Sequence, residues 1–282
     1  MAACLALLCS LSCRSASIER SDAGQIQSPI DDALLHLRLQ QELTRLQATG
    51  QPPRPATLQQ QLGRTRCELS LSKAAPKATT PARIYRRALR SVVALGWLYK
   101  CGECDNWHTT AASGFLISES GACVTSYHVV KGCQGPMGAV TAEGRFYRVA
   151  GVLAASEADD LAILQLAGRG FKPLRLRPGA PVGSTVFTIS HPNLNFFHFS
   201  RGMVSRYATL QSTKTRLFIT ADYAGGSSGG PVLDQEGRAV GVIAGTQPIY
   251  YEHKQDDRRD VQMQLKTCIP ARAILDLVEP KD

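Results

Sequence analysis

The chain has 282 residues, of which 44% are hydrophobic, which is enough for a packed core in one or two domains. Its formal net charge is +9, and the excess lies before residue 91, where 13 Lys and Arg face 6 Asp and Glu. No aromatic-basic motif or nucleic-acid-binding signature accompanies these charges, so we expect no nucleic-acid partner. We interpret the basic region as a solvated linker, with contact to an anionic envelope as the alternative.

Residues 1–17 have the pattern of a secretory signal peptide. An apolar stretch is followed by Arg14 and by the small residues of segment 15–17, although no Lys or Arg precedes it. The stretch is too short to cross a bilayer. The sequence therefore predicts a secreted or periplasmic protein, and it leaves open whether the leader is cleaved or lipidated at Cys13.

Residues 18–90 are expected to form a helical and linker region. Ser28 and Pro29 suit the start of a helix that runs to about Gln47. One stripe of this helix is apolar and consists of Leu35, Leu39, Leu43 and Leu46. We interpret the stripe as packing against the rest of the chain, and a docking or oligomerisation helix is the alternative. The proline-containing segments 52–55 and 72–81 predict linkers.

Residues 91–282 are predicted to form a mainly β domain. Short β-like stretches separated by Gly, Pro, Asn and Asp include 91–99, 114–117, 146–153, 161–166, 183–189, 217–220, 239–244 and 261–265. A helix is expected over 270–278, because Pro270 suits a first turn and apolar residues follow it. This pattern predicts two β-barrels, 91–177 and 178–282, with a C-terminal helix and a site in the cleft between them.

Three motifs contain the residue types of a serine hydrolase, in the order His, Asp, Ser. His128 follows the β-rich segment C-V-T-S-Y, Asp160 directly precedes the segment L-A-I-L, and Ser228 lies in G-S-S-G-G-P-V. A serine hydroxyl attacks only if a neighbouring base accepts its proton, and an imidazole serves this purpose near neutral pH. The carboxylate holds the imidazole in the required tautomer. The glycines around Ser228 free the amides of Gly226 and Ser228 to bind an oxyanion.

These motifs resemble those of the chymotrypsin-like serine proteases and, within them, the HtrA/Do-like bacterial trypsin-like peptidases. The resemblance spans residues 91–279 and rests on A-S-G-F-L-I-S, V-T-S-Y-H-V-V-K-G, D-D-L-A-I-L-Q-L, I-S-H-P-N, R-G-M-V-S-R, S-S-G-G-P-V and C-I-P-A-R-A-I-L. It implies two six-stranded antiparallel barrels and a serine-type endopeptidase that acts on proteins or peptides through an acyl-enzyme, without a cofactor. In this family the carboxylate directly precedes a Leu-Ala-hydrophobic-Leu strand, which favours Asp160 over Asp159.

The chain departs from this family in two respects. Ser227 stands where digestive trypsins carry an aspartate that pairs with a new N-terminus, so we expect no zymogen activation of that kind. The sequence ends soon after the expected helix, so we expect no peptide-binding PDZ module. The oligomeric state is left open.

Two alternatives compete with an active endopeptidase. The first is a catalytically silent binding module that keeps the triad residues but not their geometry. The second is an esterase, because G-S-S-G-G also satisfies G-x-S-x-G. An esterase of that type needs a parallel sheet and an Asp and a His after the serine, and only His253 follows Ser228. We therefore favour the endopeptidase.

The substrate pocket is expected to include Asp222, Ala244, Gly245 and Thr246. Asp222 lies six residues before Ser228, where trypsin-like enzymes place the acid that selects Lys or Arg at P1, the residue before the cleaved bond. Segment 244–246 instead resembles the pocket wall of HtrA-like enzymes. We favour a small or medium apolar P1 residue over a basic one, and the natural substrate is left open.

Six cysteines follow the leader: Cys67, Cys101, Cys104, Cys123, Cys133 and Cys268. Their even number suits an oxidising compartment and predicts disulfides, with a bridge between Cys123 and Cys133 around His128 as one pairing. Cys101 and Cys104, with His108 nearby, have the spacing of half a zinc site. A second ligand pair at matching spacing is missing, so we interpret these cysteines as disulfides or free thiols and expect no metal.

Overall fold

The computed structural model describes residues 28–50, 53–72, 77–210, 214–251 and 260–281. The predicted signal peptide, including Cys13, and His253 lie outside these residues. None of the described helices is both long enough and apolar enough to cross a membrane.

The first barrel closes through antiparallel pairing in the order β2-β3-β4-β7-β6-β5. Its strands are β2 (Val92–Lys100), β3 (Trp107–Leu116), β4 (Ala122–Ser126), β5 (Met137–Val140), β6 (Phe146–Ser156) and β7 (Leu161–Leu166). A short helix, α4 (Tyr127–Lys131), follows β4 directly. β7 and β8 are joined by residues 167–184, and the predicted boundary between 177 and 178 lies in this connection.

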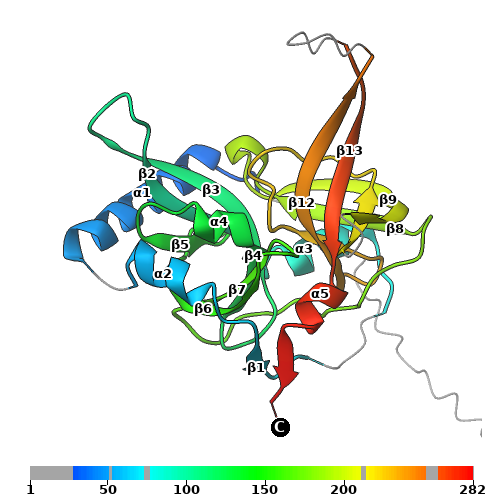
Figure 1. The fold of residues 1–282 in the computed structure, drawn as a ribbon, viewed down its shortest axis with the longest axis horizontal. Coiled ribbons are helices and arrows are strands. Elements are labelled where there is room, and N and C mark those ends of the chain that lie inside the picture. The colour runs from blue at the N-terminus through cyan, green and yellow to red at the C-terminus, as the bar shows by residue number, and fades with distance from the viewer. Residues whose placement is uncertain (1–27, 51–52, 73–76, 211–213, 252–259, 282) are drawn as a thin grey trace, which may run out of the picture.

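The second barrel closes in the order β10-β13-β12-β11-β8-β9, again with antiparallel pairs. Its strands are β8 (Thr185–Ser190), β9 (His198–Leu210), β10 (Lys214–Ile219), β11 (Pro231–Leu233), β12 (Ala239–Tyr250) and β13 (Val261–Pro270). A turn of 3-10 helix, η1 (Pro192–Leu194), precedes β9. In Figure 1 the long β12–β13 hairpin extends beyond the barrel. The two six-stranded barrels confirm the predicted fold, and the described residues contain no central parallel sheet of the kind that the esterase alternative requires.

The N-terminal region is more structured than the sequence predicted. It contains α1 (Asp32–Thr49), α2 (Pro55–Gln61), β1 (Cys67–Leu69) and α3 (Pro81–Ala88). The expected leucine stripe of α1 is buried, and α1 packs on β2, β3 and β5, so packing against the rest of the chain is confirmed. The helix begins later than expected, because the Asp31 carboxylate accepts a hydrogen bond from the Leu34 amide and caps it.

Helix α3 corrects the interpretation of the basic segment before residue 91 as a solvated linker. Thr80 caps the helix, Pro81 begins it, and Ile84 and Ala88 on one side of it are buried in the core. The predicted C-terminal helix is present but shorter, since α5 covers only Arg272–Leu275. The chain leaves this helix to form β14 (Val278–Pro280), which pairs in parallel with β1.

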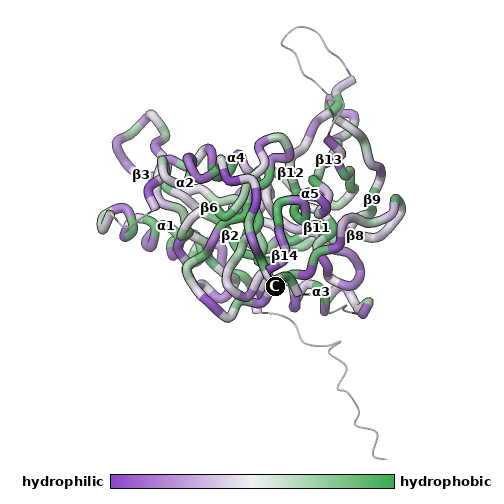
Figure 2. Tube along the Cα trace, turned by 60° about the horizontal axis from the view of Figure 1, so that its bottom comes forward, coloured by the Kyte–Doolittle hydropathy of each residue, from purple (hydrophilic) through white to green (hydrophobic). Residues whose placement is uncertain are grey.

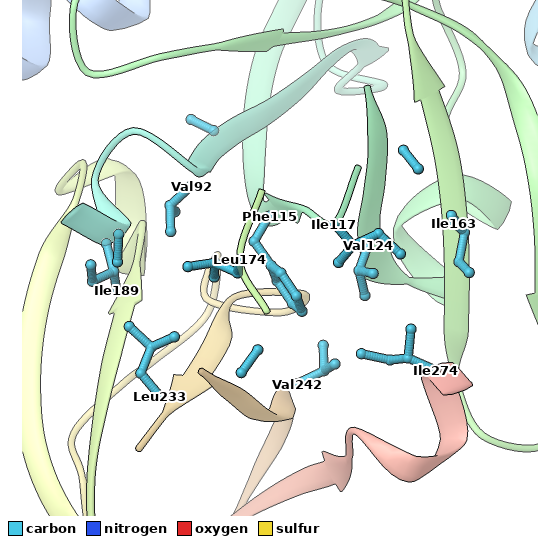
Figure 3. Close-up of a cluster of buried hydrophobic side chains, with 14 of the residues drawn as sticks. Val92, Phe115, Ile117, Val124, Ile163, Leu174, Ile189, Leu233, Val242 and Ile274 are labelled. Atoms are coloured by element: carbon cyan, nitrogen blue, oxygen red, sulfur yellow. The ribbon is translucent and has the colours of Figure 1, made fainter. Parts of the chain in front are cut away.

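The hydrophobic core joins the two barrels. Figure 3 shows one cluster with residues from both, including Phe115 and Val124 of the first barrel and Ile189, Leu233 and Val242 of the second. Each large apolar side chain buried in this way contributes about 1.5–3 kcal/mol relative to exposure. In Figure 2 the hydrophobic stretches follow the strands of the interior, and hydrophilic residues predominate in peripheral loops. The shared core fixes the barrels against each other and hence the positions of residues that each contributes to the site.

Candidate active site

The pairing of β4 with β7 brings His128 and Asp160 together. Ser126, the last residue of β4, pairs with Leu161, the first residue of β7. His128 lies two residues after this pair in α4, and Asp160 lies one residue before it. The Tyr127 amide also donates a hydrogen bond to the Asp160 carbonyl, with an N···O separation of 3.1 Å. The end of one strand and the start of its neighbour therefore place both side chains at one edge of the first barrel.

The imidazole of His128 lies directly against the carboxylate of Asp160. Its Nδ1 atom is 3.0 Å from Oδ1 and 2.9 Å from Oδ2, and the backbone amide of His128 donates to Oδ1 at 3.0 Å. Hydrogen bonding to Asp160 raises the pKa of His128, although partial burial of the ring opposes this shift. An ionised carboxylate only accepts hydrogen bonds, so Nδ1 carries the proton and the lone pair of a neutral imidazole is left on Nε2.

The neighbouring aspartate points elsewhere. The Asp159 carboxylate accepts a hydrogen bond from Ser156 Oγ at 2.7 Å and forms an ion pair with Lys214 Nζ at 3.2 Å. Asp160 itself has a φ of 59°, a left-handed conformation that Asp and Asn tolerate better than most residues. The structure therefore places Asp160, and not Asp159, next to His128.

Ser228 lies in a tight loop between β10 and β11 that packs on the first barrel. The amide of Ser113 on β3 donates to the Ser228 carbonyl at 3.0 Å, and Ser113 Oγ donates to the Gly226 carbonyl at 3.0 Å. Gly229 has a φ of 86°, and a Cβ there would lie 2.5 Å from Thr125 Oγ1 on β4. The glycine thus lets the loop approach the strand that leads to His128.

The two serines of the loop have different environments. Ser227 is fully buried, and its Oγ accepts a hydrogen bond from Ser190 Oγ at 2.9 Å. Ser228 is only partly buried, and its Oγ donates to the Ala244 carbonyl at 3.3 Å. Ser228 is therefore the more accessible serine of this pair.

Comparison with known proteins identifies a similar family and similar folds. Residues 112–242 match the family model described as a trypsin-like peptidase domain. This segment of the chain is therefore similar to that family. Among solved structures, the HtrA-type protease AlgW with a decapeptide is similar with a TM-score of 0.56 and 18% identity, covering 70% of this chain and 66% of that one. The serine endoprotease from Yersinia pestis gives a TM-score of 0.53 and 19% identity, covering 71% of this chain and 65% of that one.

Curated relatives cover about half of this chain. A probable periplasmic serine endoprotease, DegP-like, from Ectopseudomonas mendocina is 33% identical over 46% of this chain and 28% of its own length. A protein of the same description from Hahella chejuensis is 30% identical over 47% of this chain and 29% of its own length. An uncharacterized protein, y4bJ, from Sinorhizobium fredii is 30% identical over 48% of this chain and 22% of its own length. The matched region therefore spans less than a third of each of these relatives.

Within the Ser228 loop, the amides of Gly226 and Ser228 are available to a ligand. Neither donates a hydrogen bond to an acceptor in the described part of the chain. Gly226 has a φ of 90°, and a Cβ there would lie 2.5 Å from the carbonyl oxygen of His191. A residue with a side chain would therefore displace this turn, and glycine is required to present the amide.

His191 supports this loop and was missed by the sequence interpretation. It is fully buried, its backbone amide donates to Ser113 Oγ at 3.0 Å, and its Nδ1 accepts a hydrogen bond from the Phe197 amide at 2.9 Å. Burial lowers its pKa to about 4, so the ring is neutral near neutral pH. The motif I-S-H-P-N, which carried part of the family resemblance, was the signal that could have identified it.

The predicted pocket residues lie around β12 and the loop before Ser228. Asp222 has a side chain that is 82% exposed, and its carboxylate forms an ion pair with Lys266, whose side chain is only 11% exposed. Ala244 and Gly245 are partly buried on β12, and Thr246 is exposed. The carboxylate of Asp222 is therefore already paired with a cation of the protein itself.

Tyr223, next to Asp222, spans β12 and β13. Its hydroxyl lies 3.0 Å from the Gly245 carbonyl and 2.8 Å from the Thr267 carbonyl. Burial raises the pKa of this phenol, so the hydroxyl stays protonated and serves as a donor. The sequence interpretation did not single out Tyr223, because only the pairing of the two strands shows that its ring lies beside the predicted pocket wall.

The six cysteines that follow the leader are free thiols in the structure, so the predicted bridge between Cys123 and Cys133 is not formed. Cys123 points toward β3, where a Cβ on Gly114 would lie 2.9 Å from its sulfur, and this direction is fixed by the packing of the first barrel. Burial raises the pKa of Cys123, and raises that of Cys133 to about 11, so both act as small apolar core residues.

Proposed function

We propose that the two-barrel part of the chain is a trypsin-like domain and an active serine endopeptidase, with His128, Asp160 and Ser228 as its catalytic triad. The observation that carries this proposal is the double contact between His128 and Asp160, at 2.9 and 3.0 Å, beside the end of β4, against which the Ser228 loop packs through Gly229. The contact leaves the Nε2 lone pair of His128 free to act as a base. The family match and the named relatives support the same reaction class.

In the proposed reaction, Ser228 Oγ first leaves the Ala244 carbonyl by rotation about its χ1 bond and turns toward His128. Nε2 takes the hydroxyl proton while Oγ forms a bond to the carbonyl carbon of the substrate. The peptide C–N bond then breaks as Nε2 gives this proton to the leaving amine, and Ser228 is left as an ester. Water then attacks the ester carbonyl while Nε2 takes a proton from it. Nε2 returns this proton to Ser228 Oγ as the ester bond breaks, which releases the acid product and restores the hydroxyl.

The amides of Gly226 and Ser228 are proposed to form the oxyanion hole. Both are available within the described residues, and hydrogen bonds from Ser113 and His191 hold the loop that carries them. Preorganised donors of this kind need no rearrangement as negative charge develops on the substrate oxygen. Each such donor contributes about 3–4 kcal/mol to the stability of the transition state.

We infer that the pocket accepts a small or medium apolar P1 side chain. The ion pair with Lys266 neutralises Asp222, so a basic P1 residue would have to compete with a lysine that is already in place. The ring of Tyr223, held between Gly245 and Thr267, occupies space beside the pocket wall. Both features weigh against long cationic side chains.

We also propose that the protein works outside the cytoplasm on peptide or protein substrates. The N-terminal pattern predicts a secretory signal, and two relatives are described as periplasmic. One of the similar solved structures is described as an HtrA-type protease with a decapeptide, which is consistent with peptide substrates.

Cleavage of a peptide library by the full-length chain tests the proposal. We expect the wild-type protein to cut after small or medium apolar residues and Ser228→Ala to be inactive. Ser227→Ala is the matched control, because it removes a hydroxyl from the same loop, and it should keep much of the activity. If the wild-type protein bound peptides as tightly as Ser228→Ala but cut none, the chain would be a silent binding module instead.

A further inference from the structure

The loop between β2 and β3 brings two cysteines and a histidine together. Cys101 follows β2 directly, Cys104 lies three residues later, and His108 is the second residue of β3. Figure 1 shows this loop projecting from the first barrel. Cys101 and Cys104 are exposed and His108 is partly exposed, so a solute can reach all three from solvent.

The donor atoms have the separations expected around one metal ion. The two sulfur atoms are 3.6 Å apart, Cys104 Sγ is 3.1 Å from His108 Nε2, and all three donor atoms lie within 4.8 Å of one another. Tetrahedral zinc, with Zn–S of about 2.3 Å and Zn–N of about 2.0–2.1 Å, separates neighbouring donors by about 3.5–3.8 Å. A small adjustment of the loop would therefore give a metal-bound geometry.

The strands hold these ligands in place. Lys100 pairs with Trp107 and Tyr99 pairs with His108 in the β2–β3 ladder, so the loop is closed at its base. The Lys100 side chain donates to the Asp105 carbonyl and lies 4.9 Å from the centre of the Trp107 ring, and the His108 ring contacts Tyr99. A histidine on a strand and a loop closed at both ends form a largely preorganised site.

We propose that Cys101, Cys104 and His108 bind one zinc ion. Thiolate and imidazole are the ligands that zinc prefers, and two thiolates with a neutral imidazole balance its charge. The fourth position is left to water or to a carboxylate of the loop, which contains Glu103 and Asp105. The sequence gives only the Cys-x-x-Cys half of such a site, and the pairing of β2 with β3 supplies the third ligand. This proposal does not depend on the proposed peptidase activity.

Metal titration of the full-length chain tests the site. Reduced, metal-free protein should bind one equivalent of Zn²⁺, and Co²⁺ used as a probe should give thiolate charge-transfer absorption and the bands of a tetrahedral ion. Cys104→Ser and His108→Ala should each weaken Zn²⁺ binding by more than about 100-fold, because losing a ligand costs more than losing a residue that orients one. Circular dichroism should show that both variants keep the β-rich fold, since the substituted side chains lie at the surface.

Cys67→Ser and His198→Ala are the matched controls, because each removes the same type of donor elsewhere on the chain, and both should bind Zn²⁺ as the wild type does. The proposal would be overturned if reduced protein bound no Zn²⁺. It would also be overturned if Cys104→Ser or His108→Ala left the Co²⁺ spectrum unchanged. A Cys101–Cys104 disulfide in the purified protein, with no metal binding after reduction, would assign the pair to redox chemistry instead.

Discussion

Replacing Asp160 with Asn should lower kcat/KM by several orders of magnitude while leaving the fold intact. Asn is close to Asp in shape, and it tolerates the left-handed backbone at this position, where φ is 59°. The substitution therefore changes the hydrogen bonding to His128 with little backbone strain. Asp160→Ala would be less informative, because it would add that strain to the loss of the carboxylate.

The size of the effect follows from the contacts of the carboxylate. In Asp160→Asn, the side-chain oxygen would keep the hydrogen bond from the His128 amide, which Asp160 Oδ1 now accepts at 3.0 Å. The amide nitrogen would then replace Oδ2, which lies 2.9 Å from Nδ1, and would donate to the ring. The imidazole proton would move to Nε2, so the base would lose its lone pair. In the Ser-His-Asp template this change costs about 10⁴-fold in rate, or about 5.5 kcal/mol.

The assay is steady-state cleavage of the best peptide from the library, with Asp159→Asn as the control. Asp159 interacts with Ser156 and Lys214 rather than with His128, so its replacement should cost less than about tenfold. Thermal unfolding of both variants should show that stability changes little. Equal losses of kcat/KM in the two variants, or a loss confined to Asp159→Asn, would refute the assignment of Asp160.

Three further predictions follow from the surroundings of the site. The activity should rise with pH through one ionisation above the ordinary histidine pKa of about 6.5, because Asp160 raises the pKa of His128, and a midpoint below 6.5 in kcat/KM would contradict this. Asp222→Ala should lower cleavage at all P1 residues alike, since Lys266 already pairs with this carboxylate, and a loss confined to Arg and Lys would overturn the apolar pocket. His191 has a pKa of about 4 in the folded chain, so between pH 6.5 and 4 its imidazole takes up a proton more readily in the unfolded chain than in the folded one. The free energy of unfolding should fall by about 3 kcal/mol over this range through His191, and urea denaturation should show a smaller fall in His191→Gln.

Much of the fold could be predicted from the sequence because local patterns determine it. Strand-length apolar stretches separated by turn residues predicted two β-barrels, and the leucine stripe of α1 predicted a packed helix. The segment before residue 91 was harder to interpret, since its basic residues suggested a solvated linker. The segment instead contains α3, which Thr80 caps, which Pro81 begins, and in which Ile84 is buried. The pairing of β1 with β14 joins residues that are distant in sequence, and no local pattern marks it.

In the candidate site too, local sequence motifs mark some residues, whereas others are identified only by contacts between distant parts of the chain. The residues of the proposed triad, His128, Asp160 and Ser228, stand in recognisable motifs, so they could be selected as candidates from the sequence. The supporting role of Ser113 depends on contact between the first barrel and the Ser228 loop, which only the folded chain reveals. The ion pair between Lys266 and Asp222 is likewise visible only in the folded chain. The position of Asp222 six residues before Ser228 does not show that its carboxylate is paired with a lysine of the protein.

The most direct test of the account is labelling with a fluorophosphonate probe, followed by mass spectrometry to locate the modified residue. A phosphonylated serine forms only where a base and an oxyanion hole activate the hydroxyl. We predict that the wild-type chain and Ser227→Ala are labelled at residue 228 and that Ser228→Ala is not labelled. Labelling at Ser227, or no labelling of folded wild-type protein, would contradict the proposed triad.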